Sequence, residues 1–325
     1  MKEDPKGRLP VPADGPALFD ALYEDDDAVV RLLRAGVSAE SVDGEGASAL
    51  YLAAVSDRPG AVRLLLAAGA DPDRACGPER GDLPLCGAAC GGHTEVVEAL
   101  LSAGARPDLP EQFGFTALRW AVGLGHARTV EALLAYGADP CLPGPEGEPP
   151  LLLAARRGSL PTVRALLRHG AGDPPGAVGA ALAEALRMLA TDLERELRAG
   201  LRELYGDAEG DAIVVRRSVV DGGLTLTAEL LRDGRPSAGR DQQTGHGAIA
   251  TVLERELGRR APYEELARRA LRWGDPELDD WRVCVGALRE RGDEETRRAA
   301  RAWCAAPDPA RRALGAAVLA GRPTG

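Results

Sequence analysis

The chain has 325 residues, of which 50 are acidic and 40 are basic, giving a formal net charge of −10. Hydrophobic residues reach 45% but aromatic residues only 4%, so the apolar content is mostly Ala, Leu and Val, which suits thin helical layers. The acidic balance argues against nucleic-acid binding, because a phosphate backbone requires a basic face.

The N-terminal residues 1–12 predict a polar, Pro-rich flexible tail without the apolar core of a signal peptide. No apolar run approaches the roughly 18 to 20 residues that a membrane span needs. The 6 cysteines are too few for a disulfide framework. Only Lys2 and Lys6 are lysines, a bias typical of a GC-rich bacterial genome. We therefore expect a cytoplasmic bacterial protein with no membrane partner.

A motif of two leucines, two variable residues and a glycine recurs five times. It reads LLRAG, LLAAG, LLSAG, LLAYG and LLRHG, and its glycines are Gly36, Gly69, Gly104, Gly137 and Gly170. Short Ala-rich segments such as SALYLAA and TALRWAV precede the last four motifs. Each period predicts a pair of helices, and the pairs must stack because one pair cannot bury its apolar stripe alone. Each glycine is expected to end the second helix in a left-handed conformation.

These features resemble the ankyrin repeat, whose signature runs T-P-L-H-x-A-A, then G-H, V-V, L-L and G-A-D. Matching segments are GADP at 69–72 and 137–140, and Gly-His at 92–93 and 125–126. The resemblance covers residues 13–171 and implies a mainly α solenoid of about five repeats, the first a degenerate cap. It also implies a concave face, formed by the fingers and by the first helix of each pair, that binds a protein.

The stretch LCGAACGGH contains three potential metal ligands. Cys86, Cys90 and His93 are spaced i, i+4, i+7 and would share one face of a continuous helix. The repeat register places Gly91 and Gly92 in a turn between the second and third of them. We therefore interpret the stretch as part of the third repeat, and we expect no metal and no other cofactor.

The rare aromatic residues cluster in the fourth repeat. Phe113, Phe115, Arg119 and Trp120 occupy variable positions of a finger and a first helix, a composition typical of an interface hot spot. Alternatively, Phe115 or Trp120 packs between adjacent fingers; Phe113 is expected to be the most exposed of the three aromatics. The other positions expected to contact a partner are Tyr51, Leu52, Glu79, Arg80, Arg156 and Arg157.

After residue 171 the period stops. Residues 177–205 predict one or two amphipathic helices. Two β-prone runs, 212–220 and 224–231, flank the letters DGG and predict a β-hairpin, the one β element expected. Residues 172–240 are thus interpreted as a connector made of helix and hairpin, ending in a polar loop.

The region 241–325 is interpreted as a helical module. Asp-Pro pairs at 275–276 and 308–309 begin helices 33 positions apart, and the following stripes resemble HEAT-type repeats. A small helical module packed on the preceding segment explains the pattern equally well. The polar cluster at its start contains Asp241 and His246, and the latter could act as a base or bind an anion. Its alternative role is that of a structural loop residue, and we expect no catalytic residue.

Two classes of function remain. The first is a monomeric, non-enzymatic adaptor or regulatory protein that binds another protein through the concave ankyrin face. The second is an enzyme or sensor with a small site in residues 206–260 around His246, for which the repeats recruit the target. A pocket that joins His246, Asp241 and a third titratable side chain would favour the enzyme, whereas a solvent-facing His246 would not.

Overall fold

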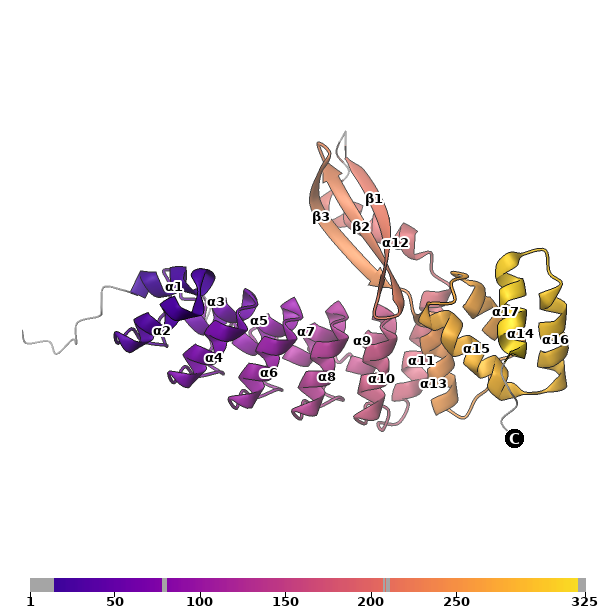
Figure 1. Ribbon diagram of the computed structural model, residues 1–325, viewed down its shortest axis with the longest axis horizontal. Helices are drawn as coiled ribbons and strands as arrows, with labels where there is room; N and C mark the ends of the chain where they lie inside the picture. The colour runs from indigo at the N-terminus through magenta and orange to yellow at the C-terminus, as the bar shows by residue number, and fades with distance from the viewer. Residues whose placement is uncertain (1–14, 78–80, 207, 209–210, 321–325) are drawn as a thin grey trace, which may run out of the picture. The chain divides into compact units, whose positions relative to one another are not determined.

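The computed structural model describes residues 15–77, 81–206, 208 and 211–320. The tail expected over residues 1–12 lies outside them. The chain divides into two compact units, one ending at Gly147 and the other beginning at Glu148. Most described residues are helical, and one small sheet lies in the second unit (Figure 1). The two units are described in turn.

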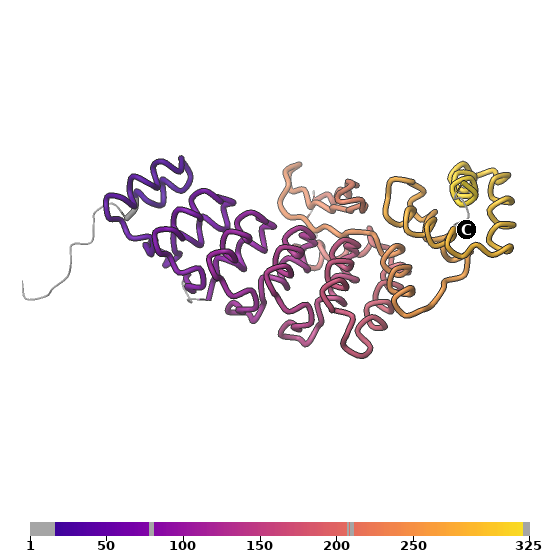
Figure 2. The backbone as a smooth tube through the Cα atoms, turned by 60° about the horizontal axis from the view of Figure 1, so that its bottom comes forward, coloured from indigo at the N-terminus to yellow at the C-terminus, as the bar shows by residue number. Residues whose placement is uncertain are grey.

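The described part of the first unit contains four helix pairs. They are α1 (Gly15–Glu24) with α2 (Asp26–Arg34), α3 (Ala49–Val55) with α4 (Pro59–Ala67), α5 (Pro84–Gly91) with α6 (Thr94–Ser102), and α7 (Ala117–Leu124) with α8 (Ala127–Ala135). Within this unit the first helices of successive pairs pack side by side, and so do the second helices (Figure 2). The core is built from small and branched aliphatic residues, as the low aromatic content predicts. The degenerate first repeat is confirmed as a helix pair.

Local chemistry explains where these helices begin and end. Ser48 Oγ accepts a hydrogen bond from the backbone N–H of Tyr51, and Thr116 Oγ1 accepts one from that of Arg119, so both hydroxyls cap first helices. Proline occupies the first turn of α4 and α5, where its missing N–H costs nothing. The motif glycines have φ of 96°, 94°, 94° and 90° at Gly36, Gly69, Gly104 and Gly137. The expected left-handed helix ends are therefore confirmed.

Histidine side chains tie consecutive pairs together within the first unit. Nε2 of His93, at the start of α6, lies 3.2 Å from the carbonyl oxygen of Val55 at the end of α3. Nε2 of His126, at the start of α8, lies 3.0 Å from the carbonyl oxygen of Cys90. Each bond joins the second helix of one pair to the first helix of the preceding pair.

The second unit contains nine described helices and a three-stranded sheet. The helices are α9 (Pro150–Arg157), α10 (Leu160–Arg168), α11 (Ala177–Leu189), α12 (Leu193–Tyr205), α13 (His246–Glu256), α14 (Tyr263–Leu271), α15 (Asp279–Arg291), α16 (Glu294–Cys304) and α17 (Pro309–Leu319). The strands are β1 (Ala212–Val220), β2 (Gly223–Arg232) and β3 (Arg235–Gln243), antiparallel in the order β1-β2-β3. Residues 148–171, grouped by sequence with the earlier repeats, belong to this unit.

The sheet corrects one prediction. The hairpin of β1 and β2 is confirmed, but the segment 235–243, expected to be a polar loop, forms the third strand along β2. Asp221 and Gly222 have φ of 51° and 78°, and Asp233 and Gly234 have φ of 51° and 73°, so both hairpins turn in the same way. Strand β3 was missed because it is polar and lies at the edge of the sheet. The signal that could have revealed it is the Asp233-Gly234 pair, which forms the turn before the strand.

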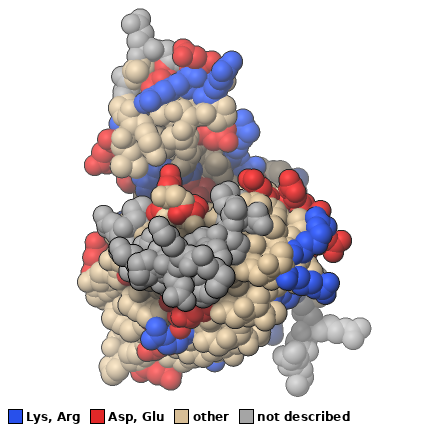
Figure 3. All heavy atoms as spheres, turned by 90° about the vertical axis from the view of Figure 1, so that its left-hand side faces the viewer, with Lys and Arg blue, Asp and Glu red and all other residues tan. Residues whose placement is uncertain are grey.

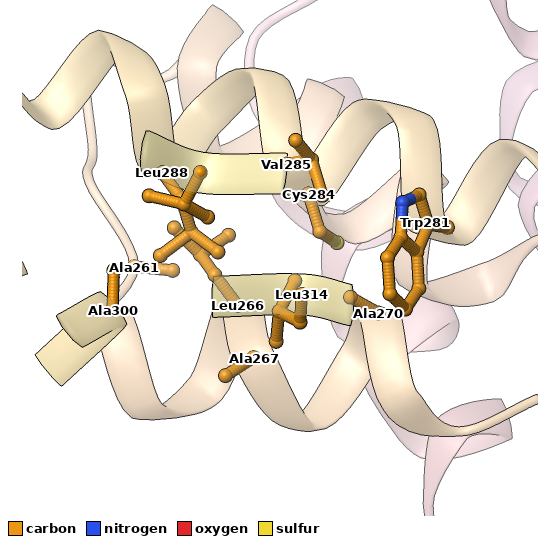
Figure 4. Close-up of a cluster of buried hydrophobic side chains, with 11 residues drawn as sticks. Ala261, Leu266, Ala267, Ala270, Trp281, Cys284, Val285, Leu288, Ala300 and Leu314 are labelled. Carbon is orange, nitrogen blue, oxygen red and sulfur yellow. The ribbon is translucent and has the colours of Figure 1, made fainter. Parts of the chain in front are cut away.

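Two apolar cores organise the rest of the unit. In the first, leucines of α12 pack against Leu224, Leu226 and Leu230 of β2. In the second, Leu266 and Ala270 of α14 meet Trp281 and Leu288 of α15, with further side chains from α16 and α17 (Figure 4). The HEAT-like character of these C-terminal helices stays a prediction.

Candidate partner-binding surface

The aromatic cluster of the fourth repeat has an ordered geometry. The rings of Phe115 and Trp120 meet edge to face, with centroids 5.3 Å apart at 84°. The guanidinium carbon of Arg119 lies 5.4 Å from the Phe115 centroid. Phe115 and Trp120 are half-buried, whereas 63% of Phe113 is exposed. As expected, Phe113 is the most exposed of the three aromatics. Phe115 and Trp120 pack on each other within the fourth repeat, and their packing between adjacent fingers stays a prediction.

The neighbouring finger holds Arg119 from its other side. A Cβ atom added at Gly144 would lie 2.7 Å from Nε and 3.2 Å from Cδ of Arg119, so the arginine stem rests on the glycine backbone. In the finger of the fourth repeat, Glu111 Oε2 accepts a hydrogen bond from the backbone N–H of Phe113 at 3.0 Å. The cluster therefore combines a fixed ring pair with a positioned cation and one exposed ring.

Tyr51 and Leu52 are half-buried on α3. The Tyr51 ring lies against Gly87 of α5, since a Cβ atom there would be 3.0 Å from Tyr51 Cε2. Burial and nearby acidic groups raise the pKa of the Tyr51 hydroxyl. Glu79 and Arg80, also predicted to contact a partner, lie outside the described residues.

Arg156 and Arg157 are engaged inside the second unit. Arg156 binds Glu148 Oε1 at 2.5 Å and Glu184 Oε1 at 2.6 Å. The Glu184 carboxylate also accepts a hydrogen bond from Arg187. The hydrogen bonds from Arg187 and Arg156 lower the pKa of Glu184 to about 2. These bonds connect α9 to α11.

Strand β3 also contacts the end of α9. Arg157 forms an ion pair with Asp241, and Gln242 Nε2 donates to the carbonyl oxygens of Arg156 at 2.9 Å and Arg157 at 2.6 Å. A partner that used either arginine would have to compete with these bonds. Their role in partner binding stays a prediction.

His246 has no exposed surface. Its Nε2 lies 3.1 Å from the carbonyl oxygen of Arg156, and burial lowers its pKa to about 4. Asp241 is exposed and paired with Arg157 instead. His246 therefore does not face solvent, and Asp241 pairs with Arg157 rather than with the imidazole. The role of this polar cluster stays a prediction.

The position of His246 identifies a feature that the sequence did not predict. Its bond to the end of α9 matches the bonds that His93 and His126 make to earlier first helices. Helix α11 packs against α9, and α13 packs against α11, as the two helices of a repeat do. Helices α11 and α13 thus form a further pair, and residues 190–245, with α12 and the sheet, are inserted between them (Figure 1).

Comparison with known proteins supports the repeats that end with α10. A family model for ankyrin repeats in three copies matches residues 75–144, and a model for a single ankyrin repeat matches residues 45–76 and 146–178. Residues 45–144 and 146–178 are ankyrin repeats. The signal that could have revealed the further pair is Gly245-His246, followed by the buried Ile249 and Leu253.

One curated relative is a glycerophosphocholine phosphodiesterase of Schizosaccharomyces pombe. It is 34% identical over 114 residues, a match that covers 35% of this chain and 10% of the relative. The chain therefore spans about a tenth of the length of the curated relative it matches. The similarity adds to the repeat assignment and brings no activity with it.

Within the third ankyrin repeat, Cys86 is buried, and burial together with Glu111 raises its thiol pKa to about 12. Its Sγ lies 3.8 Å from the carbonyl oxygen of Phe115, at hydrogen-bonding distance for sulfur. Cys90 is exposed, and His93 is engaged with Val55. Within the described part of the chain, no three His, Cys, Asp or Glu side chains are arranged to hold a metal ion.

The described surface mixes both charges. On the face shown in Figure 3, arginines lie among aspartates and glutamates, and the described residues form no continuous basic area there. Across the ranges that the structure describes, every helix is too short or too polar to cross a membrane.

Proposed function

We propose that the protein is a non-enzymatic adaptor or regulatory protein that binds another protein through the concave face of its ankyrin repeats. The observation that carries this proposal is the exposure of Phe113 beside the packed set of Phe115, Arg119 and Trp120. In many interfaces a few side chains supply most of the binding free energy, and tryptophan, tyrosine and arginine are enriched among them.

The contacts of this cluster reduce the cost of binding. Phe115 and Trp120 are held by each other, and Arg119 is held between Phe115 and the backbone at Gly144. Side chains that are already ordered lose less conformational entropy when a partner binds. Phe113 then provides apolar area that the partner covers. We place the centre of the interface at these four side chains, with Tyr51 and Leu52 at its edge.

The proposal also covers the cellular compartment, the oligomeric state and the role of His246. The 6 cysteines all lie within the described ranges and form no disulfide bond there, which supports a reducing compartment such as the bacterial cytoplasm. We propose that the chain acts there as a monomer. The complete burial of His246 supports a structural rather than a catalytic role for the polar cluster at the start of α13.

The test begins with affinity capture from native cells and continues with the purified partner. We expect Phe113→Ala combined with Arg119→Ala to weaken partner binding at least tenfold. Tyr136→Ala is the matched control, because this exposed aromatic lies at the end of α8, a second helix. An affinity that stays within twofold in the double variant would show that the interface is centred elsewhere.

A further inference from the structure

The second unit contains a cavity of about 650 Å³. Its walls come from α13, α15, the start of α14, the segment that precedes α14, and Arg164 of α10. This volume falls in the range of about 300 to 1,000 Å³ that is usual for small-molecule sites. None of its walls belongs to the partner-binding surface of the first unit.

The cavity is basic although the chain is acidic. The six arginines that line it are Arg164, Arg255, Arg259, Arg260, Arg282 and Arg291, and the three acids are Glu254, Asp279 and Glu290. Glu254 shares the buried Arg269 with Glu265, at 2.7 Å and 3.0 Å, and Glu290 binds Arg255 at 3.3 Å. Arg282 and Arg291 pair with Glu277 and Asp293, which do not line the cavity. Among the lining residues themselves, the six arginines outnumber the three acids. Positive charge therefore remains in excess around the cavity.

Arg259 and Arg260 carry much of this excess. Both side chains are exposed, and their guanidinium groups make no ion pair or hydrogen bond with any residue that the structure describes. Adjacent unpaired guanidinium groups repel each other and are well suited to bind phosphate or carboxylate groups, each through two parallel hydrogen bonds.

The floor of the cavity is aliphatic and backed by a packed core. Val252, Val283 and Ala287 line it together with Ala261 and Leu266, and the last two belong to the core cluster of Figure 4. A ligand with a short apolar body would therefore find a preformed surface below the arginines.

Gly286 provides an independent indication that the cavity is kept open. It lies in the interior of α15, where glycine costs about 1 kcal/mol relative to alanine. A Cβ atom added at this position would meet no atom within 4 Å. Packing of the chain with itself therefore does not require glycine here, whereas a ligand in the cavity would use the space and the exposed backbone.

We propose that this cavity binds a small organic anion that carries at least two phosphate or carboxylate groups. Arg259 and Arg260 hold the anionic groups, and the short body of the ligand lies on the aliphatic floor. The site goes beyond the protein binding proposed above and does not depend on it. It gives the second unit a ligand of its own.

The experiment is isothermal titration calorimetry on the full-length chain at constant ionic strength. The probes are 2,3-bisphosphoglycerate for phosphate groups and citrate for carboxylate groups, with inorganic phosphate as the single-anion comparison. We expect 1:1 binding of at least one of the two organic probes, at least tenfold tighter than inorganic phosphate. The probe that binds tighter identifies the anionic group.

Two variants locate the site. Arg259→Gln combined with Arg260→Gln should weaken binding at least tenfold, and Gly286→Leu should abolish it by filling the cavity without changing charge. Arg297→Gln combined with Arg298→Gln is the matched control, because these adjacent arginines of α16 are also exposed and lie outside the cavity. Circular dichroism checks that each variant is folded.

Three results would overturn the proposal. They are the absence of binding by both organic probes at millimolar concentration, binding of inorganic phosphate as tight as that of the organic probes, and an equal loss of affinity in the two arginine double variants. The last two would indicate general screening of charge rather than a site. Since the arginine variants change only exposed side chains, the test stands even if Gly286→Leu fails to fold.

Discussion

Nε2 of His246 lies 3.1 Å from the carbonyl oxygen of Arg156, across 90 positions of sequence. The bond has the geometry of those that His93 and His126 make within the first unit, at separations of 38 and 36 positions. It joins the second helix of an interrupted pair to the preceding repeat. Residues 190–245 are inserted between α11 and α13, and the hydrogen bond from His246 to the end of α9 is present despite this insertion.

Replacement of His246 tests this role. We expect His246→Ala to lower the free energy of unfolding by about 2–4 kcal/mol, because it removes a buried hydrogen bond and leaves a cavity. Urea denaturation of the full-length chain measures the change. His169→Ala replaces an exposed histidine at the end of α10 and should change stability by less than about 0.5 kcal/mol. Equal losses in both variants would contradict a structural tie at His246.

The two phenylalanines of the fourth repeat should differ in how much they contribute to the free energy of unfolding. Phe115→Ala removes the edge-to-face contact with Trp120 and the Arg119 contact, and we expect it to cost about 1–3 kcal/mol. Phe113→Ala should change stability by less than about 0.5 kcal/mol, since the ring is mostly exposed. Chemical denaturation of both variants gives the comparison. If Phe113→Ala were the more destabilising of the two, the division of roles between the rings would be wrong.

Asp280 should make stability depend on pH. Burial raises its pKa from 3.8 to about 7, while its Oδ1 accepts a hydrogen bond from the backbone N–H of Ala248 at 2.7 Å. The folded chain therefore binds more protons than the unfolded chain between these pH values. The stability that this group contributes is complete below pH 3.8 and is lost as pH rises to about 7, a change on the order of 4 kcal/mol.

Asp280→Asn isolates this contribution, because the amide keeps an acceptor for Ala248 and cannot ionise. We expect the variant to gain stability relative to the native chain as pH rises from 5 to 8, measured by urea denaturation at each pH. His246 acts in the opposite sense. Its pKa is lowered from 6.5 to about 4, so its contribution is present above pH 6.5 and lost as pH falls to 4. Because both chains keep His246, its contribution cancels when the variant is compared with the native chain. A difference in unfolding free energy between the two chains that did not vary with pH would refute the raised pKa of Asp280.

The buried arginine of α14 provides a further prediction. Arg269 binds Glu254 at 2.7 Å and Glu265 at 3.0 Å, and it also donates to Thr251 Oγ1 at 3.0 Å. Arg269→Met should cost about 3–5 kcal/mol, because it leaves buried acceptors without their cation. Arg268→Met is the control, since 79% of that side chain is exposed and its ion pair contributes at most about 1 kcal/mol.

A second substitution identifies the cause of the loss at Arg269. Glu254→Gln in the Arg269→Met background should recover part of the stability, because it removes the unpaired charge. Urea denaturation of the single and double variants gives the coupling. Equal stabilities of Arg269→Met and Arg268→Met would show that the buried ion pair is not formed in solution.

The sequence by itself determined the repeats, because their signals are local. Leucine pairs and a terminal glycine act within one helix pair, and both recur at nearly constant spacing from Gly36 to Gly170. The same reasoning located the hairpin of β1 and β2 and ranked Phe113 as the most exposed ring. It missed β3, whose polar residues pair with β2 at an exposed edge and bury little apolar surface.

Only the tertiary structure decided which distant groups meet. Arg156 and Arg157 looked like free concave positions, yet their partners Glu184 and Asp241 lie 28 and 84 positions away. The pair of α11 and α13 was hidden for the same reason, since the insertion separates two helices that normally follow one another. Such contacts depend on the packing of remote elements, and a local pattern carries no information about which partner will complete it.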